Sequence, residues 1–463
     1  MKIVVIDDDP TGSQTVHSCL LLLCWDVESL RRGLRHPSSL MFILANTRAL
    51  TPEAAAIRNR EIVDALVKAM AAEGIQHDEL LLVSRGDSTL RGHGVLEPQV
   101  LAQAWGEHFG DVDATLHVPA FLEGGRTTVN GVHQLHGKPV HTTAFARDRL
   151  FGYSTSDLAE WLEERSSGQI AADAVLRIPL ALLDPRRSAD LIARLEGLEA
   201  NRPVVVDAVH PGQLRALGAA IRALQGRKHF LFRSAASLLN GLVDSGPSPL
   251  GPQPLDAHGL VGLRRRNAIG QPLPGLVVVG SHVPLADQQL KSLLVNEHCL
   301  GIELPVARIA RVLEGGSPDL LMPDLLKEWL KRLEQALEAG LTPVLFTSRG
   351  ELGFGAGAAA KERRLRFGLE LAALMARLVA GVAPRLGYLI SKGGITTGTL
   401  LVEGLGLKVV QLEGQLMPGL SLVRPMAAGD QAQGCSDQLP VITFPGNLGD
   451  SNTLTQAYRW FED

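Results

Sequence analysis

Short apolar runs alternate with segments of helical periodicity along the first half of the chain. Thr51-Pro52-Glu53 combines an N-cap residue, a first-turn proline and an acid, which is typical of a helix start. Apolar residues then recur at helical spacing to Glu73, and Gly74 suits the left-handed residue that ends a helix. Strands joined by such helices through short connections indicate a parallel sheet. The runs that we predict as strands cover residues 4–6, 41–46, 79–84, 115–118, 174–178, 203–207 and 229–233, and a helix is expected at 235–243.

The second half repeats this alternation after an interruption. Residues 244–274 are rich in proline and glycine and show no sustained periodicity, so we interpret them as a linker. The chain is therefore predicted to form two α/β domains, 1–243 and 275–463, each with a mostly parallel β-sheet flanked by helices. Strands are expected at 276–279, 343–347, 388–391, 407–412 and 439–444, and helices at 286–294, 320–339, 361–379 and 399–403.

Composition and charge narrow the class of protein. A hydrophobic content of 45% with 20% charged residues is ordinary for a soluble globular chain, and the net charge of −4 offers no basic patch for nucleic acid. The apolar run before Asp7 is too short for a signal peptide and no later run reaches the length of a membrane span, so a cytoplasmic protein without a membrane partner is expected. The cysteines lack metal-ligand spacing and are interpreted as small buried hydrophobic residues, at positions 19, 24, 299 and 435.

Candidate chemistry begins at the end of the first predicted strand. Asp7-Asp8-Asp9 runs directly into Pro10-Thr11-Gly12, and adjacent acids repel one another unless a cation, a ligand hydroxyl or basic side chains lie beside them. A solvated turn is the alternative interpretation. Two further polar clusters, Arg85 to His93 and Pro119 to Gly131, also follow predicted strands. Because ligands bind beyond the carboxyl ends of parallel strands, these clusters are candidates for a binding site.

The residue types in these clusters suit a polyhydroxylated anion as the ligand. Asp8, Asp9 and Asp87 can accept hydrogen bonds from sugar hydroxyls, and a carboxylate beside one hydroxyl can take its proton during attack on a phosphoryl group. Arginines in the same clusters could pair with a substrate carboxylate, and structural ion pairs with the aspartates are the alternative. The arginines concerned are Arg85, Arg91 and Arg126.

Glycines in the second domain indicate a phosphate site. Gly393-Gly394-Ile395-Thr396 stands between a predicted strand and a predicted helix, where backbone N–H groups at the positive helix end favour an anion. Ser281 and Gly446 stand at two other strand ends of the same domain. The sequence contains no Gly-x-x-x-x-Gly-Lys-Ser/Thr loop, so the site is not of the Walker type. Ordinary turn glycines are the alternative interpretation.

Together these motifs resemble the four-carbon acid sugar kinase family, ATP-dependent kinases of tetronate-type sugar acids. The resemblance covers nearly the whole chain. In the first half, the family's Asp-Asp-x-Thr-Gly, Asp-Ser-Thr-Leu-Arg-Gly, Pro-Ala-Phe and Gly-Arg-Thr-Thr motifs are similar to residues 8–12, 87–92, 119–121 and 125–128. In the second half, its Gly-Ser turn, Gly-Gly-x-Thr loop and last glycine turn are similar to residues 280–281, 393–396 and 445–446.

The resemblance implies that an N-terminal domain binds the sugar acid and a C-terminal domain binds ATP with Mg²⁺, with the active site in the cleft between them. Asp87 is expected to act as the catalytic base. The expected substrate-binding residues are Asp8, Asp9, Thr11, Arg85, Ser88, Arg91 and Arg126, and the expected nucleotide-binding residues are Ser281, Gly393, Gly394, Ile395, Thr396 and Gly446. No metal ligand is assigned. The particular sugar acid, the phosphorylated hydroxyl and the formation of a homodimer are left open.

Two departures from the family pattern keep other functions in view. Ile395 stands where relatives often carry an acid, and Phe444 stands where they carry a lysine, so a sugar-acid-binding protein with reduced catalysis is one alternative. A second alternative is a phosphatase of the haloacid dehalogenase type, because Asp7-x-Asp9-x-Thr11 after an apolar strand resembles the nucleophile motif of that class.

Overall fold

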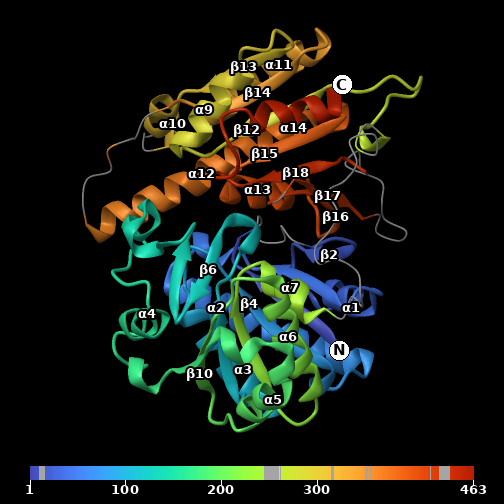
Figure 1. Ribbon diagram of the computed structural model, residues 1–463. Coiled ribbons are helices and arrows are strands. Elements are labelled where there is room, and N and C mark those ends of the chain that lie inside the picture. The colour runs from blue at the N-terminus through green and yellow to red at the C-terminus, as the bar shows by residue number, and fades with distance from the viewer. Residues whose placement is uncertain are drawn as a thin grey trace. The chain divides into compact units, whose positions relative to one another are not determined.

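The chain folds into two compact units, Met1–Pro252 and Gln253–Asp463. The computed structural model describes residues 1–9, 16–243, 260, 262–313, 318–349, 353, 357–417, 419–426 and 438–462. Figure 1 shows that each unit contains strands flanked by helices. Pro10, Thr11 and Gly12 of the first polar cluster, Cys435 and most of the predicted linker lie outside the described residues.

A parallel sheet forms the centre of the first unit, with the strand order β2-β3-β1-β4-β11-β5-β10-β9. Helices α1, α2 and α3 pack against one another in sequence, and α5, α6 and α7 do the same. The strands are β1 (Lys2–Asp7), β2 (Cys19–Leu22), β3 (Leu40–Leu44), β4 (Leu80–Arg85), β5 (Ala114–Val118), β9 (Leu176–Ile178), β10 (Arg202–Val206) and β11 (Phe230–Ser234). The helices are α1 (Val27–Arg35), α2 (Pro52–Glu73), α3 (Leu96–Phe109), α4 (Leu158–Arg165), α5 (Ser188–Glu196), α6 (Pro211–Ala223) and α7 (Ser237–Leu242).

Local sequence accounts for these elements. The central strands β3, β4 and β5 are buried along their whole length, which explains why they read as continuous apolar runs. Helix α2 has the predicted limits, because the Thr51 side chain accepts a hydrogen bond from the Ala54 N–H and Gly74 ends the helix at φ +70°.

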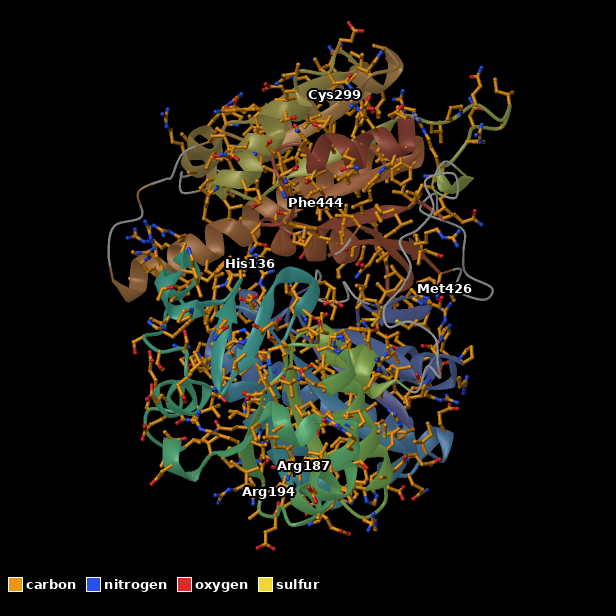
Figure 2. The ribbon with its side chains drawn as sticks, in the orientation of Figure 1. His136, Arg187, Arg194, Cys299, Met426 and Phe444 are labelled. Atoms are coloured by element: carbon orange, nitrogen blue, oxygen red, sulfur yellow. The ribbon has the colours of Figure 1, made fainter. Side chains whose placement is uncertain are left out.

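A small antiparallel sheet, β6 (Arg126–Val129), β7 (Val132–Leu135) and β8 (Lys138–Pro139), lies between β5 and α4 in the chain. Its first turn is Asn130-Gly131, with both φ angles positive, which is the usual chemistry of a two-residue hairpin. Figure 2 labels His136 in the turn after β7. The interpretation of residues 119–131 as one polar loop is therefore wrong in its second half, where a β-strand begins at Arg126.

The second unit contains a mixed sheet with the strand order β13-β14-β12-β15-β18-β17-β16, parallel from β13 to β18 and antiparallel beyond. Its strands are β12 (Gly275–Val279), β13 (Cys299–Leu304), β14 (Thr342–Thr347), β15 (Tyr388–Lys392), β16 (Val409–Met417), β17 (Leu420–Pro425) and β18 (Val441–Phe444). Its helices are α9 (Pro284–Leu293), α10 (Val306–Leu313), α11 (Pro318–Glu338), α12 (Ala358–Val382), α13 (Gly394–Thr399) and α14 (Thr453–Glu462). The predicted fold class, two α/β domains with mostly parallel sheets, is confirmed.

Three details of the second unit differ from the expectations. Helix α13 begins at Gly394 rather than at Thr399 and continues into a π-helical turn, Leu400–Gly404. The strand expected at 407–412 runs on to Met417 and forms a hairpin with β17. Residues 262–274 of the predicted linker belong to the second unit, where Arg264 Nη1 donates a 2.7 Å hydrogen bond to the Phe461 carbonyl.

Two further expectations concern cysteines and apolar segments. Cys19 and Cys299 are buried, whereas Cys24 is half-buried and its thiol donates to Asp26 Oδ2. Among the described residues, one helical stretch, Glu362–Arg385, is long and apolar enough to cross a membrane, and half of its most apolar window is buried.

Candidate functional site

In each unit, the strand order reverses at one point, and a polar cluster lies there. In the first unit, β1 is followed along the chain by β2 and β3 on one side and then by β4 on the other. In the second unit, β12 is followed by β13 and β14 on one side and then by β15 on the other. Ligands of open α/β sheets bind beyond the carboxyl ends of the strands at such a reversal. The Asp7 to Asp9 and Arg85 to Asp87 segments occupy it in the first unit.

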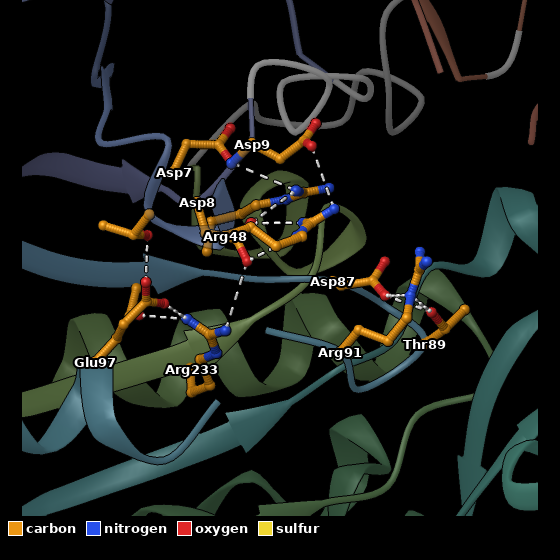
Figure 3. Close-up of polar contacts among 12 residues, drawn as sticks. Asp7, Asp8, Asp9, Arg48, Asp87, Thr89, Arg91, Glu97 and Arg233 are labelled. Atoms are coloured by element: carbon orange, nitrogen blue, oxygen red, sulfur yellow. Dashed lines mark hydrogen bonds and ion pairs between the residues drawn. The ribbon is translucent and has the colours of Figure 1, made fainter. Parts of the chain in front are cut away.

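Two arginines, half-buried Arg48 and buried Arg85, neutralise the acids at the end of β1. Arg48 Nη2 lies 2.6 Å from Asp8 Oδ1, and its Nη1 lies 3.3 Å from Asp9 Oδ2. Arg85 Nη1 lies 3.3 Å from Asp7 Oδ1 and 3.6 Å from Asp8 Oδ1. The basic side chains required by three adjacent carboxylates are therefore present in the protein itself, and Figure 3 shows Arg48 beside the aspartates.

Asp7 is as deeply buried as Asp8 and more deeply buried than Asp9. Its side chain is 1% exposed, and burial raises the pKa of Asp7 to about 7 against the opposing charge of Arg85. A carboxyl in this environment is poorly solvated and lies away from the surface that a ligand would contact.

Arg233 and Glu97 form a second group of charges next to Asp8. Arg233, on β11, has its Nη1 hydrogen-bonded to Ser84 Oγ at 2.8 Å and paired with Glu97, while its Nη2 lies 3.8 Å from Asp8 Oδ2. Gly86 makes this arrangement sterically feasible, because a Cβ there would lie 2.1 Å from the Arg233 guanidinium. These contacts fix Asp8 as part of a buried ionic network.

The loop after β4 presents Asp87 next to Arg91. Arg91 Nε donates a 2.7 Å hydrogen bond to Asp87 Oδ2, and the Thr89 hydroxyl donates to the same carboxylate oxygen. Burial alone would raise the pKa of Asp87, but the charges of Arg91 and Arg48 and these hydrogen bonds outweigh it and hold the pKa well below its ordinary value. Asp87 is therefore ionised and paired in the free protein.

Neighbouring segments hold this loop rigidly. Leu90 adopts φ +66°, an unusual conformation for a bulky residue, and its N–H donates to the Asp87 carbonyl at 3.1 Å. The Tyr153 hydroxyl donates to the Thr89 carbonyl at 2.7 Å, and His133 Nε2 lies 2.8 Å from the Ser88 carbonyl oxygen. The small antiparallel sheet thus contacts the loop through its β7 residue His133.

Arg126, the first residue of β6, has unused donor capacity. Its Nη1 donates to the Gly124 carbonyl at 2.7 Å, whereas its Nε is buried and has no hydrogen-bond partner among the described residues. The guanidinium also lies over the Phe121 ring, 5.6 Å from the ring centroid. Burial lowers the pKa of Arg126, although Asp87 opposes this effect, and a buried donor without an acceptor favours binding of an anion.

Exposure separates the predicted substrate-binding residues into two groups. The side chains of Asp8 and Arg85 are 1% and 6% exposed, whereas those of Asp87 and Arg91 are 13% and 24% exposed. Asp9 and Ser88 are each 8% exposed as whole residues. The residues that a ligand can reach are thus concentrated around Asp87 and Arg91.

In the second unit, the three predicted glycine turns meet. The Gly280 and Ser281 N–H groups donate to the Lys392 carbonyl at 3.0 and 3.2 Å, and the Gly393 N–H donates to the Phe444 carbonyl at 2.9 Å. Close packing explains the absence of side chains, because a Cβ at Gly446 would lie 2.5 Å from Ser281 Oγ. The structure therefore brings the predicted nucleotide-binding positions together.

Two cations lie at these turns. Lys392 is fully buried, its Nζ donates to the Pro445 carbonyl at 2.9 Å, and burial lowers the pKa of Lys392 to about 7. Arg349, at the end of β14, donates from Nη1 to the Ser281 carbonyl at 2.6 Å, and its buried Nε and Nη2 have no partner among the described residues. Phe444, labelled in Figure 2, leaves β18 without a basic side chain, whereas Lys392 lies on the adjacent strand β15 and Arg349, whose Nη1 is 3.1 Å from Asp287 Oδ1, follows β14.

Ile395 differs from the other nucleotide-binding candidates. It lies in the first turn of α13 and is 37% exposed, whereas Thr396 is buried. It therefore presents an apolar side chain to solvent beside the glycine turns, where a carboxylate would add negative charge near a bound phosphate.

The sequence-based reasoning did not identify Arg48, Arg233, Glu97, Lys392 or Arg349. Arg48 lies 40 residues from its partner Asp8, and Arg233 lies 136 residues from Glu97, so no local motif joins them. Lys392 precedes the predicted Gly393 loop directly, and a buried lysine at a strand end is a signal that could have found it.

Two family models match the chain. The first is described as a sugar-binding N-terminal domain and matches residues 3–242. The second is described as a nucleotide-binding C-terminal domain and matches residues 276–454. Between them they cover most of both units.

Curated relatives and solved structures align along the whole chain. A D-threonate kinase of Salmonella typhimurium is 24% identical over 476 residues, covering 100% of this chain and 99% of the relative. A D-erythronate kinase of Heliobacterium modesticaldum is 25% identical over 471 residues, covering 97% and 95%. A crystal structure from Salmonella typhimurium superposes with a TM-score of 0.64 at 19% identity, covering 99% of each chain, and one from Haemophilus influenzae with a TM-score of 0.59 at 15% identity, covering 99% and 100%.

Proposed function

This chain belongs to the four-carbon acid sugar kinase family, and from that premise we propose that it is an ATP-dependent kinase that phosphorylates a hydroxyl of a tetronate or 3-oxo-tetronate. One structural observation carries the proposal for this chain. Asp87 and Arg91 form a partly exposed pair where the strand order of the first unit reverses, so one loop offers a proton acceptor and a carboxylate-binding cation.

Arginines bind the sugar acid in this proposal. Arg126 has a buried Nε without an acceptor among the described residues, and a substrate carboxylate would supply one. Arg91 is the second candidate because it is partly exposed and at present pairs with Asp87. Arg85 is better assigned to structure, since its Nη1 already lies near Asp7 and Asp8.

Asp87 acts on the reacting hydroxyl. A carboxylate whose pKa lies far below its ordinary value is a weak base, so it can orient a hydroxyl and accept its proton only late in phosphoryl transfer. When a substrate carboxylate binds Arg91, it competes for the hydrogen bond that Arg91 donates to Asp87. Loss of that bond would raise the pKa of Asp87 and strengthen it as a base, which couples substrate binding to catalysis.

The second unit offers a fitting place for the nucleotide. Ser281 lies so close to Gly393 and Gly446 that a Cβ at either glycine would contact it, and Arg349 has buried nitrogens without a hydrogen-bond partner among the described residues. ATP, when bound, would supply the phosphoryl group that is transferred. Mg²⁺ is proposed only as the ion that accompanies ATP, and the described residues contain no cluster of three or more His, Cys, Asp or Glu side chains suited to a metal ion.

The phosphatase alternative has little support from the site. It requires Asp7 to act as a nucleophile, but the Asp7 side chain is 1% exposed and its Oδ1 lies 3.3 Å from Arg85 Nη1. The alternative of a sugar-acid-binding protein with reduced catalysis rests on Ile395 and Phe444, and the positive charges of Lys392 and Arg349 compensate in part for the second of these.

A direct assay tests the proposal. Purified protein would be incubated with ATP, Mg²⁺ and a panel of tetronates and 3-oxo-tetronates, and ADP release would be measured. We expect release above the rate without acceptor for at least one acid. ATP binding would be measured in parallel by calorimetry. ATP binding without ADP release would support the alternative of a sugar-acid-binding protein with reduced catalysis. The absence of both ATP binding and ADP release would contradict the kinase proposal.

A further inference from the structure

A small cavity lies directly beside Asp87 and Arg91. Its volume is about 20 Å³, and its wall includes Asp87, Arg91, His117 on β5, Trp161 on α4 and Ser234 at the end of β11. Since the Asp87 and Arg91 side chains are 13% and 24% exposed, this part of the wall reaches the surface of the unit.

Three polar atoms of the lining residues have no partner. His117 Nδ1, Trp161 Nε1 and Ser234 Oγ are buried and make no hydrogen bond with any described residue. The three residues are 5%, 3% and 3% exposed. Buried polar groups in native proteins are nearly always hydrogen-bonded, and each unpaired group costs roughly 1–3 kcal/mol. Three such groups around one cavity indicate that a polar group occupies it when the protein functions.

The surrounding backbone keeps the cavity open and its wall in place. A Cβ at Gly94 would lie 2.4 Å from the Trp161 ring, so only glycine lets the indole reach this position. Leu90, which also lines the cavity, is held at φ +66°. The position of Trp161 is thus set by the same loop that presents Asp87.

The available hydrogen-bonding groups match a hydroxyl. Trp161 Nε1 can only donate, and Ser234 Oγ can donate or accept. Burial, with a smaller contribution from the charge of Arg233, lowers the pKa of His117 to about 3, so its ring is neutral and carries one donor and one acceptor nitrogen. A hydroxyl, which both donates and accepts, satisfies such a mixed set.

The geometry points to this cavity as the subsite for one hydroxyl of the sugar-acid substrate, a hydroxyl that is bound for recognition beside the one that reacts at Asp87. The inference rests on the proposed function, because it assumes that the sugar acid binds at Asp87. The volume of about 20 Å³ suits a single oxygen and is small for the two oxygens of a carboxylate, which Arg126 is better placed to receive. His117, Trp161 and Ser234 are then specificity-determining residues.

Binding of single-deoxy analogues tests the subsite. Dissociation constants of a tetronate that binds the native protein, and of its 2-, 3- and 4-deoxy analogues, would be measured by calorimetry for the native protein and for the Ser234→Ala and Trp161→Phe variants. We expect one analogue to bind the native protein at least about tenfold more weakly than the parent acid, because the hydroxyl that it lacks leaves the buried groups of the cavity unpaired. In both variants, that ratio should fall towards one.

Controls keep the outcomes distinct. Ser421→Ala removes another buried serine Oγ without a partner, on β17, and should leave every ratio unchanged. If a variant raises the dissociation constants of the parent acid and of all analogues by the same factor, the cavity holds a structural water and the inference is overturned. A native protein that binds no tetronate would also overturn it. ADP release measured on the same samples reports separately on the kinase proposal, because binding with the expected ratios but without ADP supports the subsite and contradicts only the kinase.

Discussion

Lys392 and Phe444 are register partners on the adjacent parallel strands β15 and β18, and Lys392 Nζ lies 3.9 Å from the centroid of the Phe444 ring. The ammonium group also donates to the Pro445 carbonyl, so it connects the strand that precedes Gly393 with the turn that contains Gly446. Lys392 therefore places a basic side chain on the strand next to Phe444. This position makes Lys392 a support of both glycine turns.

The pH dependence of stability should reveal the buried state of Lys392. Burial lowers its pKa to about 7 from the ordinary 10.5, so between these values the unfolded chain holds a proton that the folded chain lacks. The free energy of unfolding should therefore rise with pH across this interval in the native protein, and this rise should be absent in Lys392→Met. Urea unfolding near the two ends of the interval measures the difference. Identical slopes in the two proteins would show that Lys392 keeps an ordinary pKa.

Replacement of Gly280 should weaken nucleotide binding. A Cβ at Gly280 would lie 1.9 Å from Thr396 Oγ1 and 2.9 Å from Thr396 Cβ, so Gly280→Ala must displace β12 or α13. We expect ATP affinity, measured by calorimetry, to fall at least about tenfold. Gly368→Ala is the matched control, because nothing lies within 4 Å of its added Cβ. Equal affinity in the two variants would remove the glycine turns from the nucleotide site.

The role of Asp87 as the base predicts a loss of turnover. In Asp87→Asn, kcat should fall about 100-fold or more while KM changes little, since the amide cannot accept the proton. Asp148→Asn is the control, because Asp148 Oδ2 lies 3.8 Å from Arg91 Nη1 but does not contact Asp87 in the described hydrogen-bond network. Steady-state kinetics with the sugar acid that reacts fastest in the panel would measure kcat and KM of both variants. Comparable losses in kcat and affinity would indicate that Asp87 only binds the substrate.

Arg126 should discriminate acids from their amides. Arg126→Gln removes the charge that we assign to the substrate carboxylate, so the dissociation constant of the sugar acid should rise about tenfold or more, while that of its amide stays nearly constant. Arg186→Gln, with a side chain that is 88% exposed, provides the comparison. If acid and amide weaken together, the guanidinium acts on packing with Phe121 and not on the carboxylate.

Asp8 should be more important for stability than for substrate contact. Asp8→Ala leaves Arg48 and Arg85 without their shared buried counter-ion, and we expect the free energy of unfolding to fall by about 3–5 kcal/mol. Glu107→Ala breaks an exposed pair with Arg60 and should cost less than about 1 kcal/mol. Denaturant titration compares the two. A small loss at Asp8 would show that the arginines find other partners.

Local patterns in the sequence predicted most helices and strands, but they missed two hairpins. Thr51 and Gly74 mark the ends of α2 because caps act within one turn of the chain. The hairpins β6–β7 and β16–β17 were not predicted, although Asn130-Gly131 is a strong hairpin signal. That dipeptide was interpreted within a polar loop, because short half-buried strands such as Arg126–Val129 carry little apolar periodicity.

Motifs located both halves of the candidate site, but not their electrostatic support. The acids of β1 and the loop at Asp87 come together as parallel-sheet topology requires. Arg48 and Arg233 were not predicted because their pairing depends on strand order, which no local spacing encodes. The same holds for Arg349, whose contact with Ser281 joins the ends of β14 and β12.

The small antiparallel sheet is joined to the main sheet at several points. Its Asn130-Gly131 turn is held by two 2.8 Å hydrogen bonds from backbone N–H groups to the Asp207 carboxylate, and His133 joins it to the loop that presents Asp87. Val140 and Tyr153, which follow this sheet in the chain, pack in one core cluster with Leu90 of that loop. A graft of residues 119–157 from a relative would therefore have to bring the scaffold residues that face the segment in order to keep Asp87 in place.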